Sequence, residues 1–162
     1  MTAMLTLLIL MLNTGEMPRF TSPIGQGETA PDFNLLSLNG QSFSLEEMRG
    51  KPVLINFWAT WCYPCKEEMP LLESIYAQHS EDLIVVGINQ GEKEPDIKDF
   101  IEQEKISFLI LLDEKMKVGD LYEVSGYPTS IFIDKNGIIQ AVYLGELTTD
   151  QLNHNLQLIG ID

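Results

Sequence analysis

The chain has 162 residues, a length that suits one domain with a hydrophobic core of its own. Its 24 acidic residues outnumber its 10 basic residues, and the net charge of −14 argues against nucleic acid as a partner, because phosphate binding needs clustered lysine and arginine. Two cysteines are too few for a disulfide-stapled secreted scaffold.

The N-terminal region holds an apolar run, residues 3–12, which Thr6 alone interrupts. This run has the length of a signal-peptide core and falls short of the ~20 residues that span a bilayer. No lysine or arginine precedes it, so we interpret it as a signal or anchor segment whose basic start is missing; a packed or disordered apolar tail is the alternative. We expect this segment and a Gly/Pro-containing linker to occupy residues 1–29 and to provide the only membrane contact, with one domain over residues 30–162.

Within the domain, apolar runs typical of strands alternate with segments of helical periodicity. We predict a hairpin at residues 33–45, a helical turn at 44–50, strands at 52–59, 83–89 and 107–113, and helices at 62–79 and 94–104. A short or irregular helix at 114–124, a strand pair at 128–134 and 138–145, and a final helix at 149–158 complete the domain. In the hairpin, Asn39-Gly40 predicts a tight type I′ turn, in which both residues have positive φ. This order predicts an α/β fold with a mixed central sheet and helices on both faces.

Both cysteines lie between the predicted strand at 52–59 and the helix that follows it. This position is at the carboxyl end of the strand, where α/β sheets carry their reaction sites. Cys62 falls in the first helical turn, whose free N–H groups favour an anion, so the pKa of its thiol should lie below ~8.5. Pro64 suits an early helical position, and Cys65 follows three residues after Cys62 on the same side. A disulfide across so small a loop adds little stability, so the pair is predicted to be reactive. Cys62 would attack a partner disulfide and Cys65 would resolve the mixed disulfide.

Metal binding is the main alternative use of two thiols at this spacing. A closed zinc site needs about four ligands, and the chain adds only His79 and His154, on predicted helices away from the motif. We therefore expect no metal and no cofactor. A copper(I) ion held by the two thiolates stays open, because soft thiolates select that ion. Two buried, inert thiols are the remaining alternative.

The stretch "FWATWCYPCKEEMP" resembles the active site of the thioredoxin superfamily, and "GYPT", residues 126–129, resembles its cis-proline loop. The resemblance is greatest to the ResA, TlpA and CcmG branch, on "APDFNLLSLNGQSFSL", "GKPVLINFWATWC" and an inserted helix "EPDIKDFIEQEK". It implies a thioredoxin-like fold with an N-terminal hairpin and one extra helix. It also implies a cis Tyr127–Pro128 bond facing the cysteines.

The resemblance further implies a membrane-anchored thiol–disulfide oxidoreductase on the outer side of the bacterial cytoplasmic membrane; a cytoplasmic protein is the alternative. Its substrates would be disulfides in exported proteins. Apocytochrome c would be the favoured substrate, and a membrane thiol-reducing partner would recycle the protein. Substrate contacts would come from residues that flank the cysteines and from the proline loop, namely Trp61, Tyr63, Pro64, Tyr127, Pro128 and Thr129.

Glu68 is the predicted proton carrier. Many thioredoxins have a buried aspartate six residues before the first cysteine, but Asn56 stands there and cannot ionise. Glu68 shares an i, i+3, i+4, i+7 stripe with Leu71, Leu72 and Ile75, so it should face the core, have a raised pKa, and accept the proton of Cys65. ResA-like proteins have a glutamate at this motif position. A solvated glutamate near a helix start is the alternative.

Three other functions compete with the oxidoreductase. A peroxiredoxin-like peroxidase would carry threonine three residues before its reactive cysteine, where this chain has Ala59. A copper(I)-handling protein and an interaction domain with vestigial cysteines are the others. The acidic segment at residues 92–99 is interpreted as a solvated helix start, with an influence on partner choice as the alternative, and Trp58 is interpreted as a core residue.

Overall fold

The computed structural model describes residues 24–162, so the apolar run at residues 3–12 lies outside the described residues. Within this range, no helix combines the length and apolar character needed to cross a bilayer. The elements are β1 (Asn34–Ser37), β2 (Ser42–Ser44), the short 3₁₀ helix η1 (Glu46–Met48), β3 (Val53–Trp58), α1 (Tyr63–His79), β4 (Ile84–Gln90), α2 (Glu94–Glu104), β5 (Leu109–Asp113), α3 (Lys117–Leu121), β6 (Thr129–Ile133), β7 (Ile139–Leu144) and α4 (Thr149–Leu158).

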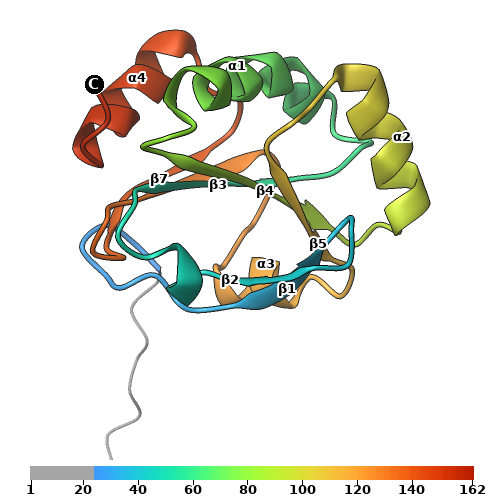
Figure 1. Cartoon of the computed structure of the whole chain (residues 1–162), viewed down its shortest axis with the longest axis horizontal. Coiled ribbons are helices and arrows are strands. Elements are labelled where there is room, and N and C mark those ends of the chain that lie inside the picture. The colour runs from blue at the N-terminus through green and yellow to red at the C-terminus, as the bar shows by residue number, and fades with distance from the viewer. Residues whose placement is uncertain (1–23) are drawn as a thin grey trace, which may run out of the picture.

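The seven strands of residues 24–162 join one sheet in the order β2-β1-β5-β4-β3-β6-β7. The central strands β3, β4 and β5 are parallel, whereas β6, β7 and the N-terminal hairpin pair antiparallel to their neighbours. Helices α1, α2 and α4 lie together on one face of the sheet, and α3 lies on the other (Figure 1). The predicted mixed sheet with helices on both faces is confirmed.

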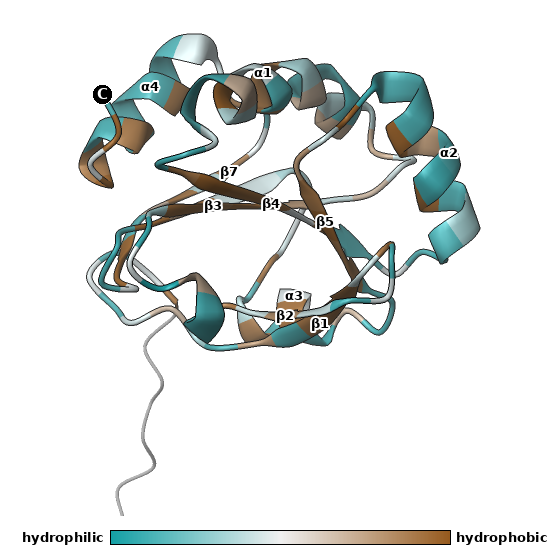
Figure 2. Cartoon of the chain, in the orientation of Figure 1, coloured by the Kyte–Doolittle hydropathy of each residue, from teal (hydrophilic) through white to brown (hydrophobic). Residues whose placement is uncertain are grey.

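Strand β3 separates two hydrophobic layers because its side chains alternate between the faces of the sheet. Leu54 and Trp58 pack in the layer beneath α1, whereas Ile55 and Phe57 pack on the α3 side. Every residue of β3 is buried, which explains its nearly continuous apolar sequence. In Figure 2 the central strands are mostly coloured as hydrophobic, and the helices turn hydrophilic residues outward. Asn56 shares a face with Leu54 and Trp58, so its amide points toward α1.

The N-terminal hairpin differs from its predicted turn. The amide of Ser37 donates to the carbonyl of Gln41 at 2.9 Å, which leaves a three-residue loop, 38–40. In this loop Gly40 has a φ of +79°, whereas Asn39 is not among the residues with positive φ. The side-chain oxygen of Asn39 instead accepts from the hydroxyl of Ser37 and the amide of Gln41. The predicted type I′ turn is therefore wrong, because local side-chain bonds favour the longer loop.

Candidate active site

The two cysteines sit in the segment that connects β3 to α1. We call residues 59–62 the active-site turn. Cys62 is the N-cap residue of α1 and forms a disulfide with Cys65, with 5.3 Å between the two Cα atoms. Its Sγ also accepts a hydrogen bond from the amide of Cys65 at 3.2 Å. Cys62 is 5% exposed and Cys65 is fully buried, so solvent and partners reach the pair through Cys62.

The proline loop faces this turn, as the resemblance implied. The Tyr127–Pro128 bond is cis, and Thr129 starts β6 immediately after it. Because β6 runs antiparallel to β3 with Thr129 opposite Phe57, the start of β6 lies at the carboxyl end of β3. The rings of Trp61 and Tyr127 then meet edge to face, with their centroids 5.9 Å apart.

The predicted substrate contacts differ in their exposure. Trp61 and Tyr63 are 70% and 71% exposed, so both aromatic rings are open to a partner beside the disulfide. Pro64 and Tyr127 are half-buried, whereas the side chains of Pro128 and Thr129 are buried. The hydroxyl of Thr129 is bound within its own loop, where it donates to the carbonyl of Gly126 at 2.7 Å. The loop therefore presents Tyr127 and backbone rather than the side chain of Thr129.

Leu144, which the sequence did not single out, extends the apolar surface of the proline loop. Its side chain is 59% exposed and lies against Gly126. It pairs with Thr129 across β6 and β7. An exposed leucine at the end of an edge strand has no distinguishing mark in the sequence.

Glu68 lies in the interior, one helical turn after Cys65, and its side chain is 1% exposed. One carboxylate oxygen accepts from the amide of Leu147 at 2.7 Å, and the other accepts from Nδ2 of Asn56 at 2.8 Å. Burial raises the pKa of Glu68 from 4.5 to about 7, although both hydrogen bonds act in the opposite direction. The predicted core-facing placement and raised pKa are both confirmed. A group with this pKa can change its protonation state near neutral pH.

Asn56 suits both protonation states of Glu68. Its Nδ2 also donates to the hydroxyl of Ser130 at 3.0 Å, while its Oδ1 is buried and has no partner among the described residues. Rotation of the amide would turn Oδ1 toward Glu68, where it could accept a hydrogen bond from the neutral carboxyl group. Asparagine therefore supplies an adaptable hydrogen-bond partner where many thioredoxins have an ionisable aspartate.

Glu92 makes a contact to the active-site turn that the sequence did not reveal. Its carboxylate accepts from the amide of Thr60 at 2.7 Å, from the hydroxyl of Thr60, and from Nδ2 of Asn89 at 2.7 Å. The interpretation of residues 92–99 as a solvated helix start is wrong for Glu92, because three donors hold its carboxylate. The remaining acids of that segment do not share these bonds.

The two histidines stand apart from the cysteines. His79 ends α1 at the opposite end of the helix from Cys62, and His154 is exposed on α4. In residues 24–162, no three His, Cys, Asp or Glu side chains cluster so that they could hold a metal ion.

The cysteine pair at the start of α1, the facing cis-proline and the mixed sheet define a thioredoxin-fold thiol–disulfide oxidoreductase. The chain belongs to the AhpC/TSA family, whose model matches residues 26–142.

Individual relatives agree with this class. The thioredoxin-like protein YneN of Bacillus subtilis is 40% identical over 83% of this chain and 81% of its own length. The thiol-disulfide oxidoreductase ResA of Geobacillus kaustophilus is 35% identical over 84% of this chain and 79% of its own length. Among solved structures, the thioredoxin domain of a thiol-disulfide oxidoreductase from Bacteroides vulgatus matches with a TM-score of 0.73 and 31% identity, covering 83% of this chain and 98% of that one. The resemblance to ResA-type proteins is thus confirmed.

Proposed function

We propose that this protein reduces disulfides in other exported proteins, with Cys62 as the attacking thiol and Cys65 as the resolving thiol. In the reduced protein, the thiolate of Cys62 attacks one sulfur of the substrate disulfide. The substrate S–S bond breaks, the second sulfur leaves as a thiolate, and a mixed disulfide joins Cys62 to the substrate. The N-cap position of Cys62 supports this role, because the free N–H groups of α1 stabilise an anion there.

Cys65 completes the exchange. Its thiol loses a proton to the carboxylate of Glu68 and then attacks the sulfur of Cys62. The mixed disulfide breaks, the remaining substrate sulfur leaves, and the protein holds the Cys62–Cys65 disulfide while the substrate gains two electrons. The position of Glu68, one turn from Cys65 and with a pKa of about 7, supports this proton transfer.

The buried carboxyl of Glu68 is the observation that carries the assignment as a reductant. Strong oxidants of this fold have a stabilised reduced form. A carboxylate beside the dithiol repels a thiolate, and this repulsion weakens that stabilisation. Tyr63, between the cysteines, carries no basic group, and the cation of Lys66, which follows Cys65, is paired with Glu104 at 2.9 Å. The pair should therefore give up its electrons readily.

The substrate would bind across the exposed aromatic rings of Trp61 and Tyr63, beside Pro64, and along the loop of Tyr127, Pro128 and Thr129. Exposed backbone at such a loop can pair with an extended segment of the partner. By the resemblance to ResA-type proteins, apocytochrome c is the favoured substrate, and a membrane thiol-reducing protein returns electrons to the pair. The corresponding location is the outer side of the cytoplasmic membrane, with the N-terminal segment as signal or anchor.

The other functions have less support. Ala59 occupies the position where a peroxiredoxin-like peroxidase needs threonine, and the relatives above are named for thioredoxin-like or thiol–disulfide chemistry. Copper(I) handling would use the same two sulfurs and predicts tight binding of one soft metal ion with little reductase turnover.

A trapping experiment tests the proposed roles of the two cysteines. Cys65→Ser and Cys62→Ser would each be mixed with a synthetic peptide closed by a Cys-x-x-Cys disulfide, and the products separated without reductant. We expect Cys65→Ser to accumulate a peptide adduct on Cys62, because its resolving thiol is absent, and Cys62→Ser to form little adduct, because Cys65 is buried. Equal adducts on both variants, or a predominant adduct on Cys65, would contradict the assignment.

A further inference from the structure

The contact of Glu92 with Thr60 joins the start of the inserted helix region to the active-site turn. Glu92 lies between the end of β4 and the start of α2, two residues before Glu94. The amide and the hydroxyl of Thr60 both donate to its carboxylate, and Nδ2 of Asn89, at the end of β4, donates to the same oxygen as the Thr60 amide. Hydrogen bonds to a carboxylate are among the stronger ones in proteins. Glu92 therefore ties the turn after β3 to the end of β4.

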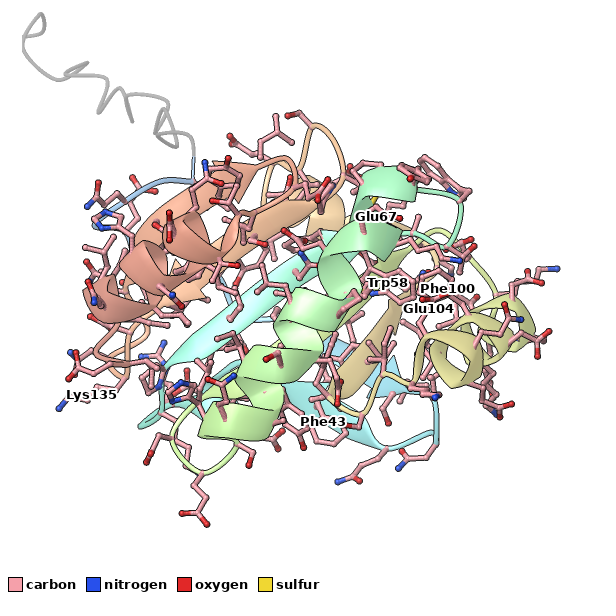
Figure 3. All side chains as sticks on the ribbon, turned by 90° about the horizontal axis from the view of Figure 1, so that it is seen from above. Phe43, Trp58, Glu67, Phe100, Glu104 and Lys135 are labelled. Carbon is pink, nitrogen blue, oxygen red and sulfur yellow. A yellow bond between two sulfur atoms is a disulfide. The ribbon has the colours of Figure 1, made fainter. Side chains whose placement is uncertain are left out.

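Two further contacts connect α2 to the elements that carry the cysteines. Phe100 packs against Trp58, the last residue of β3, with ring centroids 5.0 Å apart and ring planes tilted by 38°. Glu104 forms an ion pair with Lys66, which follows Cys65 on α1, at 2.9 Å. Figure 3 shows Trp58, Phe100 and Glu104 close together where α1 and α2 face each other. Helix α2 thus contacts the chain both before the cysteines, at Trp58, and after them, at Lys66. Glu92, just ahead of α2, bonds to the turn itself.

A hydrogen bond within the turn also restrains it. The amide of Cys62 donates to the carbonyl of Ala59 at 3.2 Å, which closes the turn from within. Between these bonds lies Trp61, whose ring is 70% exposed and is in contact with Tyr127. Without Glu92, the amide of Thr60 and the buried amide of Asn89 would lose their acceptor, and the position of Trp61 would depend on weaker contacts.

We propose that Glu92 is a positioning residue for thiol–disulfide exchange: through Thr60 it holds the active-site turn so that Trp61 and Cys62 meet a polypeptide substrate in a fixed arrangement. This inference rests on the exchange reaction proposed above. In this role Glu92 does not touch the reacting sulfurs. Its effect should appear with substrates that contact Trp61 and the proline loop, because small errors in placement of such a surface slow a reaction strongly.

Three variants separate positioning from charge and from stability. Glu92→Ala removes every bond to the turn. Glu92→Gln can keep all of them: its oxygen can accept from the Thr60 and Asn89 amides, and its amide can donate to the Thr60 hydroxyl, which also accepts. Thr60→Val keeps the charge and the backbone bond but removes the hydroxyl bond.

Each reduced protein would be reacted with the Cys-x-x-Cys disulfide peptide and, separately, with Ellman's reagent, a small aromatic disulfide. We expect Glu92→Ala to lower the rate constant for the peptide about tenfold. We expect it to change the rate with Ellman's reagent by less than about threefold, because a small reagent needs little of the surrounding surface. Glu92→Gln should stay within about twofold of the wild type for both probes, and Thr60→Val should be slowed with the peptide by about threefold.

A Glu92→Ala protein as fast as the wild type with the peptide would overturn the inference. So would a Glu92→Gln protein as slow as Glu92→Ala, since that result assigns the effect to charge. An equal slowing of Glu92→Ala with both probes would also contradict it. If Glu92→Ala does not fold, an unchanged peptide rate in Thr60→Val would overturn the inference by itself. A wild type that does not react with the peptide would contradict the proposed function, whatever the variants do.

Discussion

Glu68 carries its carboxyl into the hydrophobic layer beneath α1, at a cost that only two hydrogen bonds offset. Its placement follows from helical periodicity, because Glu68, Leu72 and Ile75 share the buried side of α1. Its partners do not follow from the sequence. The amide of Leu147 comes from a segment 79 residues away, so only the folded chain brings the two together.

The hydrogen-bond partners of Glu92 likewise do not follow from the sequence. Thr60 lies 32 residues before it. A local sequence pattern does not distinguish an acid that accepts hydrogen bonds from a turn after the neighbouring strand from an acid at a solvated helix start. The pairing of Cys62 with Cys65 was predictable because it depends on a short motif, whereas the place of Pro128 beside them was implied only by the resemblance. Contacts between distant segments were not predictable.

Replacement of Glu68 by glutamine should stabilise the oxidised protein at high pH. The folded-state pKa of about 7 exceeds the ordinary value of 4.5, so the wild type binds its proton more tightly when folded, and its stability falls as the pH rises between these values. At pH 8 we expect Glu68→Gln to unfold with a free energy up to about 3 kcal/mol higher than the wild type, and near pH 4 this advantage should disappear. Urea unfolding of both oxidised proteins across this pH range measures the difference.

Glu67→Gln is the matched control, because Glu67 is exposed on the neighbouring position of α1 and points away from the core (Figure 3). Its difference from the wild type should be small and should not grow through the same pH window. A Glu68→Gln effect that is independent of pH would mean that the carboxyl is not buried in the way described.

Among the elements, the strands were easier to predict than the turns. The buried runs of β3 and β4 and the periodicity of α1 and α2 are properties of many residues, so one unusual residue does not change the outcome. Helix α1 continues through Pro70, whose exposed position lets water reach the carbonyl that loses its partner. The hairpin loop depends on two side chains and one glycine, and there the Asn39-Gly40 pair predicted the wrong turn.

Strand β4 packs against its neighbours at a glycine. A Cβ at Gly87 would lie 2.7 Å from Cδ1 of Ile110, 3.0 Å from Nε1 of Trp58 and 3.1 Å from the ring of Phe108. We therefore expect Gly87→Ala to lower the free energy of unfolding by about 1–3 kcal/mol, as overpacking does in other cores. Thermal or urea unfolding would measure the loss.

The double variant Gly87→Ala, Ile110→Val tests the cause. Valine lacks the Cδ1 methyl group that makes the shortest contact, so the second change should recover part of the loss although Ile110→Val alone costs about 0.5–1.5 kcal/mol. If the losses of unfolding free energy in the two single variants simply add in the double variant, Ile110 is not the side chain that the new Cβ at position 87 overlaps.

In the assembled molecule, the order of the strands in the sheet decides which segments meet. Parallel β3, β4 and β5 bring the active-site turn, Asn89 and Glu92 to one edge, and β6, antiparallel beside β3, places Pro128 at the same edge. Alternation of strands and helices predicted the parallel part, and the pair of apolar runs at residues 128–134 and 138–145 predicted the returning strand β7. The position of β6 next to β3 was implied only by the resemblance, because periodicity does not state which strands are neighbours.

The equilibrium reduction potential of the Cys62–Cys65 pair decides whether this protein is a reductant. The full chain would be equilibrated in a graded thiol–disulfide buffer, and its free thiols would be labelled and counted by mass. A protein that reduces exported disulfides should show one two-electron transition near or below the potential of thioredoxin, about −270 mV. A transition well above about −200 mV would identify an oxidant or isomerase and would contradict the proposed reduction of exported disulfides.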